Sequence, residues 1–511
     1  MPFNSYVFVL LLLPLSMAGF RFASLFGAQF ARRWLLVCSI AFYALWSPAF
    51  VAILATSIAF NYAIGGAILS PDRGDRQKDW LLAIGVGGNI ALLFYAKYLP
   101  ALLEASFGAS AAPFAQSIIV PIGVSFFTFT QIGYLVDCRG GQAAGRSFSD
   151  YALFIFFFPC LISGPILRHR ELVPQFEDSA TYRFRVDSSL AVGMTLFIIG
   201  LAKKAAIADD LSTFADHGFS DTSHLRLISA WSAAVCYSLQ LYFDFSGYSD
   251  MALGIARMFG FRLPLNFNSP YKATSVIDFW QRWHMSLTRF ITRYIYNPLA
   301  MRAARRRAVQ GKPVFSRKTA DLGGFSAMVA FPMLLTMILV GVWHGAGWQF
   351  LVFGLLHGLY LTINHAWRVF GPLPQRAWRG MRIASLLASW SLTYFAVLIA
   401  QVFFRASSAG SAIDLVFGML GARGIETFGE ADAPQVVDVV GLIVLFAIVL
   451  TTPNSQQILA KFSPTTTAVE PSRWRWLQWQ PNAAYALIAG FVLFFAIGAL
   501  RQQAPFLYFK F

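Results

Sequence analysis

Apolar runs long enough to cross a lipid bilayer recur along the whole chain and limit the folds open to it. They lie at residues 6–20, 34–47, 50–69, 80–99, 118–137, 151–166, 188–202, 228–245, 325–342, 349–366, 383–404, 436–452 and 483–500. A segment inside hydrocarbon must satisfy its own backbone hydrogen bonds, as an α-helix does. Several runs are short or interrupted by glycine or proline. We therefore predict an all-α polytopic membrane protein with about 11–13 transmembrane or re-entrant helices.

The composition excludes soluble classes of protein. Hydrophobic residues make up 57% of the 511 residues and charged residues 13%, too few charges for a surface in water. The net charge of +16 would suggest nucleic acid in a soluble chain. Here the basic residues lie in short stretches between apolar runs, as in cytoplasmic loops. No basic and aromatic nucleic-acid module accompanies them, so we predict no nucleic-acid partner.

Loop charges predict how the chain is threaded through the membrane. Residues 301–318 hold seven basic side chains and no acid, and residues 367–382 hold four arginines and no acid, so we place both loops in the cytoplasm. Residues 424–438 hold four acids and are placed outside. The two apolar runs within 325–366 should then form a hairpin. Its turn puts His344 towards the outer half of the membrane, or at the floor of a cavity open to the outside.

His344 is a candidate for chemistry. It lies in the stretch Gly341–Trp348, which contains three glycines and two tryptophans. Glycines allow a helix to break and a substrate to approach closely. An ionisable side chain at membrane depth is costly and is a functional candidate by default. A neutral imidazole can take a proton from a hydroxyl group near pH 7. The alternative is a histidine that hydrogen-bonds to a broken helix, and the residues alone leave both open.

His284 lies in a second unusual segment, residues 278–296. As one continuous helix, this segment would place Asp278 and Arg282 on a charged stripe, within reach of an ion pair, and His284 on the opposite, apolar stripe. It is either an interfacial helix on the cytoplasmic side or a re-entrant helix that pushes His284 towards the core. The sequence does not choose between them.

Two acids next to an apolar run, Asp244 and Asp250, have several possible roles. They could relay protons, cap a helix that starts near Ser249, or pair with Arg257 or Arg262. We favour a structural role.

The five remaining histidines are expected at the surface, at helix ends or in packed positions, and we assign a packing role to His357 on its apolar helix. The four cysteines have no metal-binding spacing, and no phosphate loop or dinucleotide fingerprint is present. We predict no metal and no bound cofactor.

An ordered series of motifs resembles the membrane-bound O-acyltransferase superfamily, and most closely its bacterial alginate O-acetylase branch, with the teichoic-acid D-alanyl transferases as near relatives. The motifs lie at residues 120–129, 158–166, 242–252, 266–271, 278–287, 342–348 and 505–511. The resemblance implies one transmembrane domain over 1–511, with a catalytic core at about 118–404 and additional C-terminal spans at about 436–511. Its helices would form a ring around a central funnel and tunnel.

The same resemblance implies the site residues and the reaction. His344 would be the essential catalytic residue and His284 the second one. Trp343, Trp280, Asp244 and Asn268 are further candidates for substrate binding. The expected reaction moves an acetyl group from a cytoplasmic thioester, acetyl-CoA or an acyl carrier, across a bacterial inner membrane. The acceptor would be hydroxyls of an exported, alginate-type polysaccharide or a periplasmic partner acetyltransferase.

Two alternatives remain at this point. One keeps the fold and transfers D-alanine to teichoic acid. The other is a transporter of polysaccharide or lipid, for which no repeated halves are visible in the sequence. The basic loop 302–318 could attract a phosphate-bearing donor or an acidic carrier, or it could serve membrane topology alone.

Overall fold

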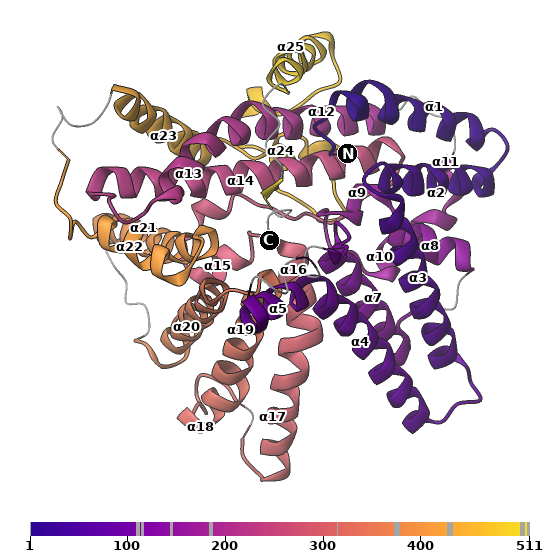
Figure 1. The fold of residues 1–511 in the computed structure, drawn as a ribbon, viewed down its shortest axis with the longest axis horizontal. Coiled ribbons are helices and arrows are strands. Elements are labelled where there is room, and N and C mark those ends of the chain that lie inside the picture. Colours follow the sequence, from indigo (N-terminus) through magenta and orange to yellow (C-terminus); the bar gives the residue numbers. More distant parts are fainter. Residues whose placement is uncertain are drawn as a thin grey trace. The chain divides into compact units, whose positions relative to one another are not determined.

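A computed structural model describes residues 2–108, 113, 117–143, 147–182, 188–313, 315–372, 379–426, 433–500 and 506–507. Every regular element within these ranges is helical, which confirms the all-α prediction (Figure 1). The predicted outer acids Glu430 and Asp432, the loop residue Arg376 and most of the tail motif at 505–511 lie outside the described residues.

The chain forms two compact units. The first comprises Met1–Ile207, Asp244–Leu265 and Pro453–Lys510; the second comprises Ala208–Phe243 and Asn266–Thr452. The long helix α14 (Leu227–Met258) gives its first half to the second unit and its second half to the first. The predicted domain boundaries and the central funnel stay predictions.

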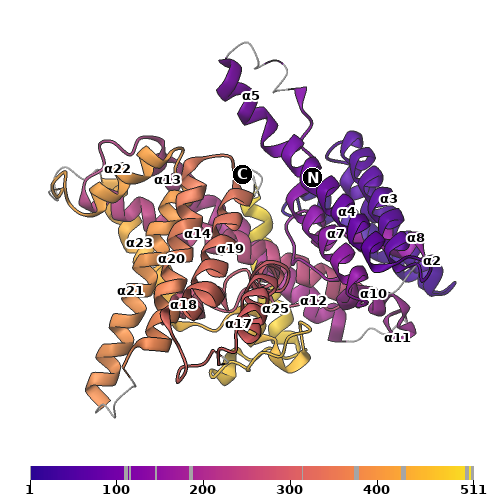
Figure 2. The ribbon, with the colours of Figure 1, turned by 90° about the horizontal axis from the view of Figure 1, so that it is seen from below.

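The first unit is built from the N-terminal helices and two C-terminal ones. These are α1 (Leu13–Ser24), α2 (Ala28–Ala44), α3 (Pro48–Leu69), α4 (Asp75–Lys97), α5 (Leu99–Phe107), α7 (Val124–Arg139), α8 (Phe148–Phe156), α9 (Phe158–Leu161), α10 (His169–Glu177), α11 (Ser179–Tyr182), α12 (Ser188–Ala202), α24 (Ser455–Ile458) and α25 (Ala483–Ala499). Helices α3, α4 and α7 pack side by side (Figure 2).

The second unit holds both candidate catalytic histidines. Its helices are α13 (Asp209–Ser220), α15 (Val276–Trp280), α16 (Met285–Ile291), α17 (Asn297–Val309), α18 (Leu322–Phe325), α19 (Phe331–His344), α20 (Trp348–Phe370), α21 (Arg379–Arg405), α22 (Ala409–Met419) and α23 (Ala433–Thr451). Helix α15 packs against α20 and α21.

Among the described residues, five helical stretches are long and apolar enough to cross a membrane. They are Pro48–Leu69, Asp75–Lys97, Ser189–Ser220, Leu322–His344 and Met381–Arg405, and four shorter apolar helices accompany them. Every predicted apolar run overlaps a helix, but some runs are broken. The run at 151–166 divides into α8 and α9 because Phe157 leaves the helical conformation just before Pro159, whose ring and missing N–H do not allow the helix to continue through it.

The predicted hairpin at 325–366 is confirmed. Helix α19 ends at His344, three residues form the turn, and α20 begins at Trp348 and packs along α19. The two backbones approach closely at a pair of glycines: a Cβ atom on Gly341 would lie 3.0 Å from the Cα of Gly354. Only glycine fits such an approach, so the glycine that allows tight packing lies one turn before the histidine.

Candidate functional site

His344 is the last residue of α19, and its side chain is buried, with 4% of the residue exposed. Its ring contacts those of Trp343, Phe404 and Phe353, at centroid distances of 4.6, 4.8 and 5.6 Å. Phe404 belongs to the end of α21, and the next residue, Arg405, forms an ion pair with Asp216 on α13. The imidazole is therefore held in an aromatic enclosure to which α19, α20 and α21 all contribute.

A second buried histidine, His357, lies on α20 beside this enclosure. Its ring contacts Phe353, which also covers His344, at 4.8 Å. The indole Nε1–H of Trp280 donates to His357 Nδ1 at 3.2 Å. An indole nitrogen only donates, so His357 Nδ1 must carry a lone pair and the neutral ring holds its proton on Nε2. The packing role assigned to His357 from the sequence did not include this bond to Trp280, which is a candidate for substrate binding.

The predicted continuous helix over 278–296 is wrong. Helix α15 ends at Trp280 and α16 begins at Met285, and His284 between them has a left-handed backbone with φ of +42°. A non-glycine residue in that region is strained by about 1–3 kcal/mol. His284 is also buried, with 1% exposed, so it lies in the core as the re-entrant alternative predicted, but in a break between two helices and not within one. The predicted pair of Asp278 and Arg282 does form, at 2.7 Å.

Asn266, from the extended segment before Asn268, holds the break in place. Its side-chain oxygen accepts from the Ser286 backbone N–H at 3.2 Å and from the Ser286 hydroxyl at 2.9 Å, and it lies 3.1 Å from His284 Nδ1. The Asn266 atom that accepts the Ser286 backbone N–H must be the amide oxygen, because the amide nitrogen only donates. His284 Nδ1 must therefore donate its N–H to that oxygen. The neutral His284 ring then carries its lone pair on Nε2. His357 and His284 are thus fixed in opposite tautomers.

Asn266→Ala should destabilise the second unit by about 1–3 kcal/mol, because the buried donors around the break lose their shared acceptor. The free energy of unfolding in detergent measures this effect. Asn297→Ala is the control: Asn297 is an exposed residue at the start of α17 in the same unit, and its truncation should leave the unfolding transition nearly unchanged. Equal losses in both variants would show that Asn266 has no special position.

A continuous series of ring contacts joins the two candidate catalytic histidines. From His344 it passes through Phe353, His357, Phe279, Trp283 and Phe267 to His284, with centroid distances between 4.8 and 6.4 Å. All these residues belong to the second unit. The structure therefore brings His344, His284, Trp343 and Trp280 into one aromatic array, and Asn268 lies in the segment that borders it.

Tyr271 anchors that segment to the surrounding helices. Its hydroxyl donates to the Ser238 carbonyl at 2.7 Å and accepts from the Gln401 side chain at 3.1 Å. Its own carbonyl accepts from the Trp390 indole at 2.8 Å. Helices α14 and α21 therefore fix the segment that carries Asn266 and Asn268.

Asp244 belongs to the first unit, where it is paired. Its carboxylate lies 2.6 Å from Lys204 Nζ and accepts the backbone N–H of Leu507 at 3.0 Å. Asp250 lies 2.7 Å from Lys203 Nζ and accepts from Ser455 and Gln456 on α24. The predicted partners Arg257 and Arg262 are therefore wrong. So is the cap near Ser249, because both acids lie inside α14.

Within the part of the chain that the structure describes, no group of three or more His, Cys, Asp or Glu side chains could hold a metal ion. The candidate groups for chemistry in the second unit stay the imidazoles of His344 and His284. Asn266 accepts a hydrogen bond from His284, and Trp280 donates one to the neighbouring His357. Sequence reasoning missed Asn266, although it lies in one of the motifs, because its contact with His284 crosses 18 residues.

Residues 139–311 match the membrane-bound O-acyltransferase family. The peptidoglycan O-acetyltransferase of Helicobacter pylori is 33% identical over all of this chain and 97% of its own length. The probable alginate O-acetylase AlgI of Pseudomonas putida is 34% identical over the full length of both chains. The teichoic acid D-alanyltransferase of Bacillus subtilis is 28% identical over 48% of this chain and 59% of its own length.

Proposed function

Because this chain belongs to the membrane-bound O-acyltransferase family, we propose that it transfers an acetyl group from a cytoplasmic thioester to hydroxyls of an exported polysaccharide. The observation that carries the proposal is the burial of His344 and His284 in one aromatic array. Two full-length relatives named as O-acetylating enzymes, at 33% and 34% identity, support acetyl as the transferred group.

His344 is the proposed general base. Its imidazole accepts the proton of the acceptor hydroxyl as that oxygen attacks the thioester carbonyl. The tetrahedral intermediate then collapses, the carbon–sulfur bond breaks, and the leaving thiolate takes the proton from the imidazolium. Burial among Trp343, Phe353 and Phe404 supports this role, because water that would hydrolyse the thioester is kept from the reacting atoms.

His284 is the proposed second residue of the site. With Nδ1–H donated to Asn266, its Nε2 carries a lone pair that can accept a hydrogen bond from the acceptor hydroxyl. The strained backbone at φ +42° supports a functional role, since strain of this kind persists where surrounding groups over-determine it. Trp343, Trp280 and Asn268 stay proposed substrate contacts. Asp244 is proposed as a structural residue, because both of its oxygens have partners.

Trp280→Phe should lower the transfer rate about tenfold by releasing His357, whose ring supports Phe353 and thereby His344. Trp231→Phe is the matched control, since the Trp231 indole also donates one hydrogen bond, to the Met419 carbonyl at 2.9 Å, in a half-buried position on another part of the second unit. Both variants should lose similar stability in a detergent unfolding assay. A rate loss shared equally by both would contradict a positioning role for Trp280.

The acceptor has two candidates. The alginate O-acetylase relatives support an alginate-type polysaccharide, and the Helicobacter pylori relative, aligned along the whole chain, supports peptidoglycan. Transfer of D-alanine has weaker support, because the teichoic acid relatives align with about half of the chain at 28% identity or less. A bacterial inner-membrane location and a periplasmic acetyltransferase partner complete the proposal.

Mass analysis of acetyl groups in both polymers tests this proposal. Cells lacking the protein should lose O-acetyl groups from the exported polysaccharide or from peptidoglycan, and the polymer affected identifies the acceptor. Liposomes holding the purified chain should consume acetyl-CoA or an acetylated carrier inside only when acceptor is present outside. Movement of polysaccharide or lipid without any donor would instead support the transporter alternative.

The basic loop predicted at 302–318 begins in the structure as the last part of α17, and the whole stretch can contribute to donor binding only in part. Arg307 is buried and lies 2.6 Å from Asp321, whose pKa is lowered first by the Arg307 hydrogen bond and then by the Gly324 backbone. This arginine therefore holds the loop against the start of α18. The attraction of a phosphate-bearing donor is proposed for the other basic residues of the loop.

A further inference from the structure

The second unit contains an apolar pocket for which the proposed reaction has no use. It lies between α13, α14 and α23 and has a volume of about 390 Å³. This volume falls in the range of sites that bind small ligands. It is too small for a helix of a partner protein, but it suits a single flexible chain.

The walls of the pocket favour an aliphatic occupant. Its buried surface comes from Leu211, Ala233, Cys236 and Leu442. The Cys236 thiol donates to the Leu211 carbonyl at 3.4 Å, so the polar atoms there already bond to each other. Water would find few partners in such a space, and an empty apolar cavity forfeits dispersion contacts. A hydrocarbon chain makes dispersion contacts with these side chains, so it is a more favourable occupant of the pocket than water and more favourable than an empty cavity.

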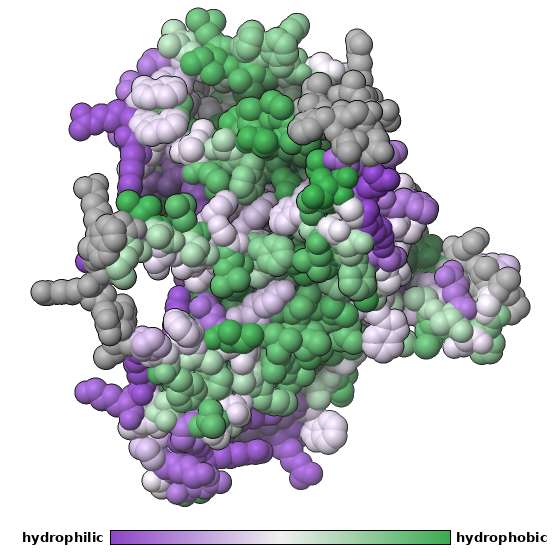
Figure 3. Space-filling model, turned by 90° about the vertical axis from the view of Figure 1, so that its left-hand side faces the viewer, coloured by the Kyte–Doolittle hydropathy of each residue, from purple (hydrophilic) through white to green (hydrophobic). Residues whose placement is uncertain are grey.

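The mouth of the pocket opens where the neighbouring surface is apolar. Phe214 and Ile228 at the rim are 46% and 37% exposed, and the adjacent α23 residues Val440 and Ile443 are 57% and 63% exposed. Helix α13 also belongs to the apolar stretch Ser189–Ser220. Figure 3 shows the side of the molecule on which α13 and α23 lie in Figure 1, and hydrophobic residues predominate there. The surface around the mouth of the pocket is therefore apolar, as a surface in contact with bilayer hydrocarbon is.

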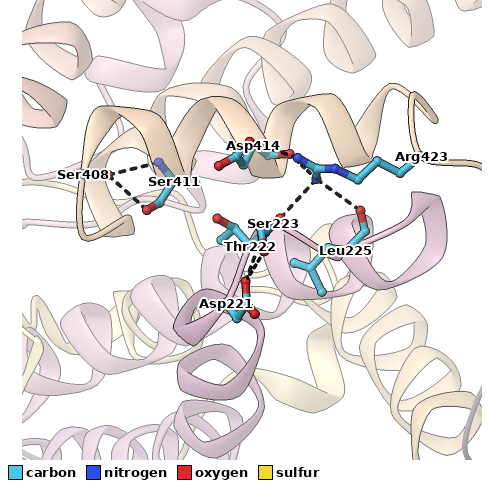
Figure 4. A network of polar contacts seen from close by, with 8 residues as sticks. All are labelled: Asp221, Thr222, Ser223, Leu225, Ser408, Ser411, Asp414 and Arg423. Atoms are coloured by element: carbon cyan, nitrogen blue, oxygen red, sulfur yellow. Dashed lines mark hydrogen bonds and ion pairs between the residues drawn. The ribbon is translucent and has the colours of Figure 1, made fainter.

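Ser229, one of the few polar residues that line the pocket, belongs to a hydrogen-bond network next to it, whose acceptor Glu426 is not part of the lining. Glu426 accepts the backbone N–H groups of Ile228 and Ser229 at 2.8 and 3.1 Å and the Ser229 hydroxyl at 2.6 Å. Arg423 ties the α13–α14 connection to α22: it donates to the Thr222 carbonyl at 3.1 Å and to the Asp414 carboxylate at 2.9 Å (Figure 4). The exposed His217 also lines the pocket. Polar groups next to apolar walls match a lipid.

We propose that this pocket binds one acyl chain of a membrane phospholipid, with the head group near His217 and Ser229. The bound chain fills the gap between α23 and the α13–α14 pair. It thereby joins α23 to the rest of the second unit. This site is separate from the aromatic array of His344 and does not depend on the proposed function.

Photo-crosslinking in liposomes tests the proposal with the full-length protein. The probe is phosphatidylcholine with a diazirine near the end of one acyl chain, and mass spectrometry maps the labelled residues. Labelling at Cys236 and Leu442 should exceed labelling at Leu487, a 75% exposed residue of α25, by about tenfold. Equal labelling would mean surrounding bilayer lipid only and would overturn the proposal.

Gly441→Phe supplies the matched variant. Gly441 lines the pocket, and a Cβ atom there would meet no atom within 4 Å, so a side chain can enter the space. It should reduce the labelling about tenfold, whereas Val444→Phe on the same helix, outside the pocket, should not. Gly441→Leu serves if the larger residue prevents folding. Unchanged labelling of the Gly441→Phe protein would overturn the proposal. Loss of labelling of the wild-type protein on addition of polyisoprenyl phosphate would also overturn it, because the pocket would then bind that lipid and not a phospholipid.

Discussion

His344→Ala should lower the rate of acetyl transfer by about 10²–10⁴-fold, the usual contribution of a positioned general base. The rings around it belong to Trp343, Phe353 and Phe404, and none can accept a proton from a hydroxyl group. The variant should still insert into the membrane, because the hairpin of α19 and α20 is held by close backbone packing at Gly341 and Gly354. Acetyl groups per polymer repeat, measured by mass analysis, give the rate.

Two comparison variants make this result specific. His344→Gln keeps a buried polar side chain of similar size, so a loss of activity in both variants assigns the effect to proton transfer. His224→Ala removes a histidine whose side chain is 86% exposed and should leave the rate unchanged. Persistent polymer acetylation by folded His344→Ala protein would remove this residue from the reaction and leave His284 as the candidate base.

The position of His344 could be predicted because the signal is local. Three glycines within seven residues, between two long apolar runs, indicate a helix break wherever they occur. Basic loops on both sides then require a hairpin. The structure confirms the helix end and the turn, and both follow from residues adjacent in sequence. The enclosing ring of Phe404 could not be predicted, since Phe404 lies on α21, 60 residues further along the chain than His344.

The geometry of His284 shows where local reasoning fails. Helical periodicity over 278–296 is genuine, yet the chain breaks at 281–284, because Asn266 offers the donors of the break an acceptor that a helix would not use. Tertiary contacts override periodicity when a buried polar side chain satisfies the backbone. The motif containing Asn266 was visible in the sequence. That motif contains two asparagines, Asn266 and Asn268. Only the structure shows that Asn266 lies next to His284 and orients its imidazole.

The partners of Asp244 and Asp250 were missed for a related reason. Their lysines, Lys203 and Lys204, end an apolar run and look like cytoplasmic flanking charges. Helices α12 and α14 approach so closely that a Cβ atom on Gly247 would lie 2.8 Å from the Gly200 carbonyl oxygen. Because the two helices cross so closely, Lys203 and Lys204 contact acids on α14. Lys203 and Asp250 are 47 residues apart in the sequence. Loop-charge rules describe the membrane side of a segment and not its tertiary partners.

Asp244→Ala should destabilise the first unit by about 3–5 kcal/mol, the cost of removing one member of a buried ion pair. Lys204 has a side chain that is only 4% exposed, and it would lose its counter-charge inside the protein. The Leu507 backbone N–H would lose its acceptor as well. Unfolding in detergent measures the loss. Asp79→Ala, which breaks an ion pair with Arg139 whose acid is 65% exposed, should leave the unfolding transition unchanged.

A paired variant separates structure from proton transfer at this site. Lys204→Met combined with Asp244→Leu removes both charges and replaces them with apolar groups, which should restore most of the lost stability. If the pair is structural, as both occupied carboxylate oxygens indicate, this variant should also keep most of the acetyl transfer rate. A stable double variant without activity would instead assign Asp244 to proton relay. The same unfolding and acetylation measurements therefore decide between the two roles that the sequence left open for this acid.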